Sequence, residues 1–418
     1  MKRHFTLYIV IAMLLGIVVG SLLHARISDP AELAELGGYL SLVTDVFLRL
    51  IRMIIAPLVF STLVSGIAHM GNSSALGRVA LRSLAWFLLG SLVSLLLGIL
   101  MVTLLQPGAG LALPIPAADA ASGVTTASLT LKDFITHLVP RSIAEAMATN
   151  EILQIVVFAG FFGTAVAQLG TRAARVLEFT EQLATVMLRV TGYVMLTAPL
   201  AVFAAVAATV SAHGLTILAT YGKFIGSFYL SLGCLWGVLL ALGFLVLRGR
   251  VFELLRLIRE PVLLAFSTSS SEAAYPKTLE QLERFGASER IASFVLPLGY
   301  SFNLDGSMMY CTFAVLFIAQ AYGITLGFAQ QLSMLLLLMV TSKGMAGVPR
   351  ASLVVIAATL SHFHIPEAGL LLILAVDQFL DMARAATNVV GNSIATAVVA
   401  SWEKELSVSA ETELAGAA

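Results

Sequence analysis

The segment 366–402 carries the densest set of charged and amide side chains in an otherwise apolar stretch. Because an α-helix turns about 100° per residue, five of them fall on a stripe about 80° wide: Asp377, Asp381, Arg384, Asn388 and Asn392. The planar guanidinium of Arg384 suits a carboxylate, and Asp381 suits an ammonium group. The alternative is that Asp381 and Arg384 only neutralise each other so that both can be buried. The length of the stripe favours a site for a zwitterion or an acidic amino acid.

A second polar interruption breaks the apolar run 291–319 at Asn303, Asp305, Gly306 and Ser307. Amide and carboxylate oxygens, together with carbonyls freed by a broken helix, are ligands for a small hard cation. This pattern predicts a cation site at Asn303 and Asp305, with no other metal and no bound cofactor. The alternative is a glycine-kinked helix with a capped turn.

Two further segments resemble hairpin tips. The run Ser267–Ser271, followed by Glu272, lies between two short apolar arms. Hydroxyls and exposed backbone amides at such a tip suit a carboxylate, although serine-rich runs are more often flexible linkers. The second tip, Gly344–Pro349, is rich in glycine and is predicted to move as a lid.

These residues belong to a chain with the composition of a helical membrane protein. Hydrophobic residues make up 59%, charged residues 11%, and the mean hydropathy is +0.95, whereas soluble proteins are about 25% charged. The net charge of zero and the lack of a basic tail argue against a nucleic-acid partner. No signature of a metalloprotease, a lipase-like hydrolase or an ATP-driven pump occurs, so we expect no enzyme and no catalytic residues.

Six early runs are long enough to span a bilayer, roughly 5–24, 40–69, 82–105, 152–170, 183–211 and 218–247.

The apolar runs change character after about residue 250. Segments 254–286 and 328–360 each place a polar tip between two arms that are too short to span, so we expect each to enter and leave the membrane on one side. A long helix follows each one, at 288–322 and 366–402, which suggests inverted repeats around a midplane site. Lys and Arg gather in alternate loops, which predicts cytoplasmic N- and C-termini in a cell inner (plasma) membrane.

Five motifs, in this order, resemble those of the dicarboxylate/amino acid:cation symporters, a family that includes glutamate, aspartate and C4-dicarboxylate transporters. They are Arg52–Phe60, Ser269–Glu272, Asn303–Gly306, Ser342–Pro349 and Asp377–Asn392, and the resemblance runs from about residue 5 to 405. It implies an all-α polytopic membrane protein with eight transmembrane helices, two re-entrant helical hairpins and inverted repeats. It also implies a homotrimer surrounded by lipid and an elevator-type movement. The implied divisions are scaffold helices in 1–70 and 151–216, a transport domain from 78–106 and 217–405, an extracellular or periplasmic loop at 107–150, and a cytoplasmic tail at 406–418.

The resemblance also implies roles for individual residues. Arg384 holds the distal carboxylate of the substrate, and Asp381 holds its amino group. Further substrate contacts are implied for Ser269, Ser270, Ser271, Gly347, Val348 and Asn388. The outer gate comprises Gly344, Ala346, Gly347, Pro349 and Arg350. Arg350 stands where a neutral residue is expected, and it either adds a carboxylate contact or faces the outside water. The residues implied in coupling are Glu272, Asn303, Asp305, Asn388 and Asn392, with sodium at Asn303 and Asp305 if it binds.

Departures from the family pattern bear on the coupling ion. Asn392 stands where sodium-dependent members carry an aspartate, and Phe87 and Gly90 stand where they carry tyrosine and threonine, with Ser91 retained. A cation site that loses a carboxylate loses much of its attraction. Proton coupling is therefore favoured over full sodium coupling.

Glu272 is the candidate proton carrier, and Asp305 and Asp381 are its rivals. Asp381 favours L-glutamate or L-aspartate, so we expect a symporter that imports acidic amino acids with H⁺, Na⁺ or both. The alternative is a symporter of C4-dicarboxylates such as succinate, fumarate and malate, because Thr268 and Glu272 resemble that branch. An anion channel is a more remote alternative.

Overall fold

The computed structural model describes residues 5–27, 29–70, 73–109, 139–214, 221–341, 351–374 and 376–407. Within these ranges the regular structure is helical, apart from one isolated antiparallel bridge between Ala287 and Leu406. The helices are α1 (Phe5–Arg26), α2 (Pro30–Met70), α3 (Ser73–Leu105), α5 (Ile143–Thr149), α6 (Ile152–Leu169), η2 (Gly170–Ala173), α7 (Ala174–Met195), α8 (Ala198–His213), α10 (Gly222–Leu247), α11 (Arg250–Thr268), α12 (Ser271–Phe285), α13 (Glu289–Phe302), α14 (Asp305–Ala321), α15 (Phe328–Thr341), α16 (Ala351–His362), η4 (Glu367–Gly369), α17 (Leu370–Leu374) and α18 (Asp377–Trp402).

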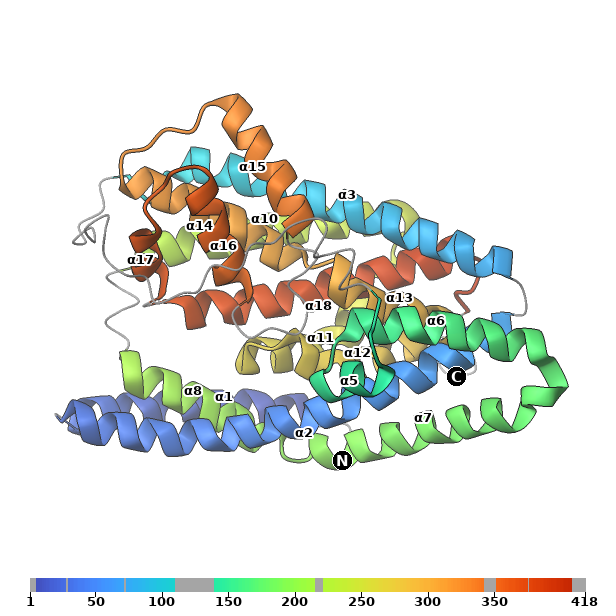
Figure 1. Cartoon of the computed structure of the whole chain (residues 1–418). Coiled ribbons are helices and arrows are strands. Elements are labelled where there is room, and N and C mark those ends of the chain that lie inside the picture. Colours follow the sequence, from blue (N-terminus) through green and yellow to red (C-terminus); the bar gives the residue numbers. More distant parts are fainter. Residues whose placement is uncertain are drawn as a thin grey trace.

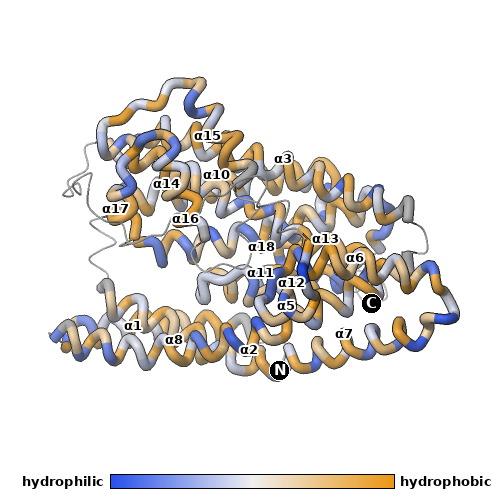
Figure 2. Tube along the Cα trace, viewed as in Figure 1, coloured by the Kyte–Doolittle hydropathy of each residue, from blue (hydrophilic) through white to orange (hydrophobic). Residues whose placement is uncertain are grey.

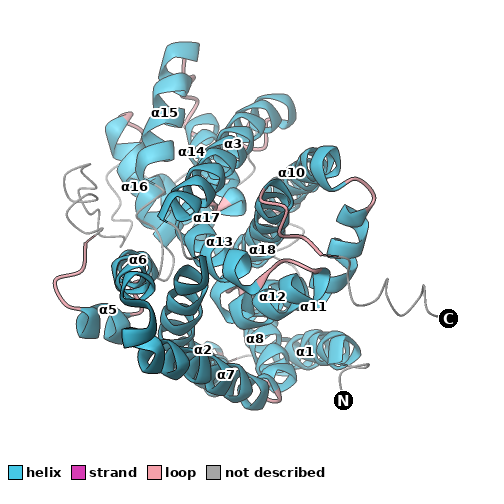
Figure 3. Ribbon diagram, turned by 90° about the vertical axis from the view of Figure 1, so that its right-hand side faces the viewer, coloured by secondary structure: helices cyan, strands magenta, loops and turns pink. Residues whose placement is uncertain are grey.

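The helices form layers around α18. Helices α1, α2, α7 and α8 lie on one side, where α1 packs along α8 and α2 contacts α6, α7 and α8 (Figure 1). Helices α3, α10 and α14 to α17 lie on the opposite side, and the view turned by 90° shows the same separation (Figure 3). Between them, α18 contacts α3, α10, α11, α12, α13 and α14. The last long helix of the chain is thus the central one.

The outer surface is suited to lipid. Large apolar side chains face outward on the single chain, and Phe161 and Leu245 are each 76% exposed. Figure 2 shows hydrophobic residues along most of the outer helices. In the described residues, six helical stretches are long and apolar enough to cross a membrane: Leu7–Arg26, Ala31–Ala68, Leu76–Leu105, Ile152–Met195, Gly222–Leu247 and Glu289–Ala321. The chain is therefore a polytopic helical protein, and the eight spans with two re-entrant hairpins stay a prediction.

Helices α11 and α12 form a hairpin whose turn follows from local chemistry. Ser269 ends α11 in the left-handed conformation, with φ of 52°. The Ser270 hydroxyl then accepts a hydrogen bond from the backbone N–H of Ala273 at 3.2 Å and caps α12. Gly286 ends α12 with φ of 106°, and a Cβ there would lie 2.5 Å from the carbonyl oxygen of Ser407. Glycine is therefore required at the base of the hairpin.

Two helices extend beyond the apolar runs seen in the sequence. The loop expected at 107–150 contains helix α5 at its described end, closed by Asn150 in the left-handed conformation with φ of 56°. Helix α2 begins at Pro30 rather than near residue 40, because the segment 31–36 is rich in Ala, Glu and Leu, which favour a helix without being uniformly apolar. Hydropathy alone therefore placed its start too late.

The C-terminal strap, Trp402–Ser407, closes the far end of the central layer. The Glu403 carboxylate pairs with the guanidinium of Arg78 at the start of α3, with Nη2 and Oε2 3.0 Å apart. The backbone N–H of Ser407 donates to the Gly286 carbonyl at 2.9 Å. The strap thus joins α18 to α3 and to the base of the hairpin.

Candidate functional site

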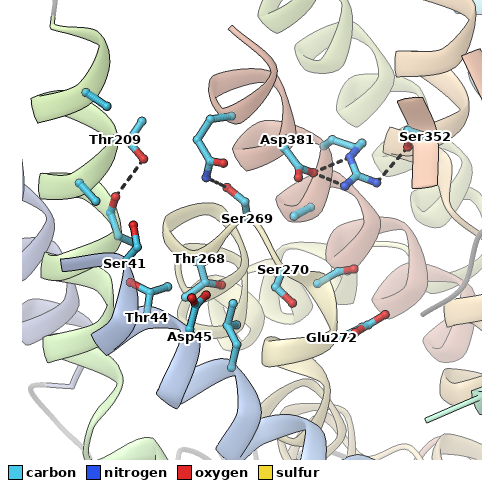
Figure 4. A pocket seen from close by; sticks show the side chains of 18 of the residues that line it. Ser41, Thr44, Asp45, Thr209, Thr268, Ser269, Ser270, Glu272, Ser352 and Asp381 are labelled. Carbon is cyan, nitrogen blue, oxygen red and sulfur yellow. Dashed lines mark hydrogen bonds and ion pairs between the residues drawn. The ribbon is translucent and has the colours of Figure 1, made fainter. Parts of the chain in front are cut away.

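A cavity of about 660 Å³ lies between α2 and α8 on one wall and the α11–α12 tip and α18 on the other. Figure 4 shows Ser41, Thr44 and Asp45 of α2 facing Thr268 and Ser269 of the tip, with Asp381 of α18 beyond them. The lining is rich in hydroxyl, carboxylate and guanidinium groups. A cavity of this polarity suits a small charged solute.

Arg384 is held at the wall of this cavity by three elements. Its Nη1 donates to the hydroxyl of Ser307 on α14 at 2.9 Å and to that of Ser352 on α16 at 3.2 Å. Its Nε donates to Oδ1 of Asp381, one turn earlier on α18, at 2.6 Å, and Nη2 contacts the same oxygen. These contacts fix the plane of the guanidinium, which is what bidentate carboxylate binding requires.

Asp381 lines the cavity but is not a free carboxylate. Its Oδ1 is occupied by Arg384, whereas no hydrogen bond within the described residues is assigned to Oδ2. The mutual neutralisation considered from the sequence is therefore present as a contact. It leaves one oxygen for a donor group on a ligand.

The serines of the tip line the cavity, and each also has a structural task. The Ser269 hydroxyl accepts a hydrogen bond from Nε2 of Gln378 at 2.7 Å, and the Ser270 hydroxyl caps α12. The carbonyl of Ser271 accepts from the Tyr300 hydroxyl at 2.9 Å. Since the first backbone N–H groups of α12 lie at this tip, its helix dipole favours an anion there.

Glu272 follows these serines in the first turn of α12 and lines the same cavity. It also borders a second, much smaller cavity together with Tyr275 and Tyr300. Of the three carboxylates considered as proton carriers, Glu272 and Asp381 line the cavity, whereas Asp305 does not.

Asn388 lines the cavity, but both ends of its amide hold the start of α14. Its Oδ1 accepts from the backbone N–H groups of Gly306 at 2.9 Å and Ser307 at 3.3 Å. Its Nδ2 donates to the Ser307 hydroxyl at 3.1 Å. Asn388 thus positions Ser307, which in turn contacts Arg384.

Asn303 and Asp305 form a second polar cluster at the break between α13 and α14. Nδ2 of Asn303 donates to Oδ2 of Asp305 at 3.1 Å, while its Oδ1 is buried with no hydrogen-bond partner in the described residues. A Cβ at Gly90 would lie 2.8 Å from Oδ1 of Asp305 and 3.1 Å from Oδ1 of Asn303, so these two oxygens converge. Gly391 closes the opposite side against Oδ2 of Asp305. Two converging oxygens with one negative charge fit a proton or a monovalent cation.

The predicted stripe of five residues is wrong as a single ligand-facing surface. Asp377 accepts a hydrogen bond from the Tyr310 hydroxyl at 2.7 Å and does not line the cavity. Asn392 is buried against Gly299, and neither end of its amide has a hydrogen-bond partner in the described residues. It lies beyond the cavity lining.

The residues of α18 that line the cavity are Gln378, Asp381, Arg384, Ala385 and Asn388. Sequence reasoning missed Gln378, although it lies one turn before Asp381 on the same face. It also gave no role to Ser352, because a single serine in a mainly apolar stretch is a weak signal.

The predicted gate lies outside the described residues, because the structure describes nothing between 341 and 351. This applies to Gly344, Ala346, Gly347, Val348, Pro349 and Arg350.

Comparison with known proteins gives a consistent family. The sequence model of the sodium:dicarboxylate symporter family matches residues 5–402. A C4-dicarboxylate transport protein of Pseudomonas syringae pv. tomato is 40% identical over 406 residues, covering 95% of this chain and 85% of its own length. A C4-dicarboxylate transport protein of Deinococcus radiodurans is 39% identical over 410 residues, covering 96% of this chain and 89% of its own length. The proton/sodium-glutamate symport protein of Bacillus caldotenax is 38% identical over 405 residues, covering 94% of this chain and 93% of its own length.

These relatives span nearly the whole chain, and their names describe transporters rather than enzymes. The chain belongs to the sodium:dicarboxylate symporter family.

Proposed function

We propose that the chain is a symporter that imports C4-dicarboxylates together with protons. The observation that carries this proposal is Arg384, whose guanidinium is fixed by Asp381, Ser307 and Ser352 at the wall of a polar cavity. The relatives named C4-dicarboxylate transport proteins support this substrate over the acidic amino acids that the sequence favoured.

The charges around the cavity supply a physical reason for coupling. Among the described lining residues, three are carboxylates, Asp45, Glu272 and Asp381, and two are guanidiniums, Arg52 and Arg384. These groups sum to one negative formal charge, so a dianion enters a site that already repels it. A co-transported proton or cation offsets that repulsion, because like charges in a weakly screened cavity cost several kcal/mol.

We propose Glu272 as the proton carrier, because it borders the cavity in which the substrate binds. Asp305 is the second candidate, since it is buried beside Asn303 and between two glycines. Sodium at Asn303 and Asp305 has fewer charged ligands than a strong site requires, because Asn392 is neutral.

A second substrate class, the acidic amino acids, is favoured by Asp381. Asp381 lines the cavity, its Oδ2 has no hydrogen bond assigned within the described residues, and an ammonium group is a natural donor to such an oxygen. The name of the Bacillus caldotenax relative agrees with this reading.

The movement and assembly are also proposals. Layering of α1, α2, α6, α7 and α8 against the helices around α18 supports a fixed scaffold and a mobile transport domain. Exposed apolar side chains such as Phe161 and Leu245 support contact with lipid or with other copies in a homotrimer. We place the protein in the cell inner membrane with both termini cytoplasmic, and we assign the gate to residues 344–350 of the sequence.

Uptake by proteoliposomes tests this function. Labelled succinate and labelled L-aspartate are supplied separately, with either a proton gradient or a sodium gradient alone. We expect succinate to accumulate above its equilibrium level with protons alone, which a channel cannot achieve. Aspartate uptake without succinate uptake would refute the dicarboxylate assignment, and a strict sodium requirement would refute the coupling ion.

A further inference from the structure

The first turn of α18 is fixed on both sides of Gln378. The Tyr310 hydroxyl of α14 donates to Oδ1 of Asp377 at 2.7 Å. The Tyr229 hydroxyl of α10 donates to the backbone carbonyl of Phe379 at 2.7 Å. The backbone that carries Gln378 is therefore anchored to two neighbouring helices.

From this anchored turn, Gln378 reaches the tip of the α11–α12 hairpin. Its Nε2 donates to the Ser269 hydroxyl at 2.7 Å, and both residues line the cavity. Figure 4 shows Ser269 at the tip of the hairpin. Ser269 has φ of 52°, a conformation that a residue with a Cβ adopts at a cost. The Ser270 hydroxyl bonds within the hairpin, to the N–H of Ala273. The side chain of Gln378 thus connects a strained tip to the helix that carries Arg384.

We propose that Gln378 is a positioning residue, whose hydrogen bond to Ser269 holds the hairpin tip against α18 in the arrangement that accepts substrate. This inference rests on the proposed function, because it treats the cavity as the dicarboxylate site. When the hydrogen bond is absent, the hairpin tip also adopts arrangements that do not accept substrate. The apparent affinity for substrate then falls in proportion to the fraction of molecules that keep the accepting arrangement.

Substitution Gln378→Met tests the proposal, because methionine has a similar length but cannot donate. A neutral hydrogen bond changes an equilibrium by about 2- to 12-fold. We expect KM for succinate to rise about fivefold, with the maximal rate of uptake unchanged. The matched control is Gln182→Met on α7, an exposed amide whose Nε2 contacts Glu178 at 3.2 Å, and it should keep the original KM.

A double-mutant cycle separates positioning from direct contact with the substrate. If the hydrogen bond to Ser269 is the cause, Gln378→Met has no further effect on KM in a Ser269→Ala background. An unchanged KM in the single variant, or an equal increase in the Ser269→Ala background, would overturn the proposal.

Two controls keep the outcome interpretable. If gel filtration shows that the Gln378→Met protein is not folded, the same double-mutant cycle is carried out with Gln378→Ala. Absence of succinate uptake by the unmodified protein would instead refute the proposed function. Normal uptake by both Gln378 variants would refute this inference alone.

Discussion

Neutralising Asp381 separates the two roles that its position allows. Oδ1 of Asp381 accepts a hydrogen bond from Nε of Arg384 at 2.6 Å, and Asp381 also lines the cavity. Asp381→Asn keeps the shape of the side chain and removes its charge. If Asp381 also receives an ammonium group, the variant weakens L-aspartate selectively, while succinate has no group to lose.

The expected magnitude follows from the contacts. A hydrogen bond between charged groups contributes about 1.5–3 kcal/mol, so L-aspartate should bind about 10- to 150-fold more weakly. For succinate, a carboxylate placed at a separation of about 5 Å from the Asp381 carboxylate would experience a repulsion of about 3 kcal/mol at an effective dielectric constant of about 20, and the substitution would relieve it. Loss of the fixed guanidinium plane opposes this gain. We therefore expect succinate affinity to stay within about threefold or to improve.

Competition by unlabelled L-aspartate and succinate against labelled substrate in proteoliposomes measures both affinities. Asp45→Asn is the matched control, because it removes a carboxylate from the α2 wall of the same cavity and should leave the ratio of the two affinities unchanged. Equal losses for both substrates in Asp381→Asn would show that Asp381 only positions Arg384. Unchanged aspartate affinity would refute an ammonium contact.

Three other substitutions test the remaining parts of the site. Arg384→Ala removes the fixed guanidinium and should reduce dicarboxylate uptake at least about 100-fold, because a buried charged contact is lost; substantial residual uptake would contradict its role. Glu272→Gln should abolish uptake driven by a proton gradient but retain substrate exchange across the membrane, and normal proton-driven uptake would exclude Glu272 as carrier. Gly391→Ala places a methyl group against Asp305 and should destabilise the protein by about 1–3 kcal/mol, seen as a lower thermal midpoint; an unchanged midpoint would mean that the cluster adapts.

The sequence predicted the helical membrane architecture because long apolar runs and sparse charges leave few alternatives. It also selected Asp381, Arg384 and the serine tip, which the fold brings to one cavity. Intramembrane charge and hairpin tips are local signals, so they can be recognised without knowledge of the packing.

The remaining details depend on which neighbours surround α18. Helical periodicity does not reveal how far along α18 the cavity extends, so Asp377, at the start of the stripe, was grouped with the ligand site although the Tyr310 hydroxyl donates a hydrogen bond to it. Gln378 was passed over because a lone amide is a weaker signal than a charge. The hydrogen bond from the backbone N–H of Gly306 to Oδ1 of Asn388 joins two segments that are distant in the sequence, and helical periodicity does not predict such a contact.

The C-terminal strap has a consequence for synthesis of the protein. Glu403 follows Arg78 by 325 positions, so the ribosome needs about 16–65 s, at 5–20 residues per second, to produce the partner of that arginine. Until then α3 lacks both this ion pair and the central helix against which it packs. The side of the molecule that contains α3, α10 and α14 therefore reaches its final packing only after nearly the whole chain has been made. A chain truncated before α18 would keep a large unpacked surface inside the bilayer, where quality-control proteases and chaperones recognise incomplete products.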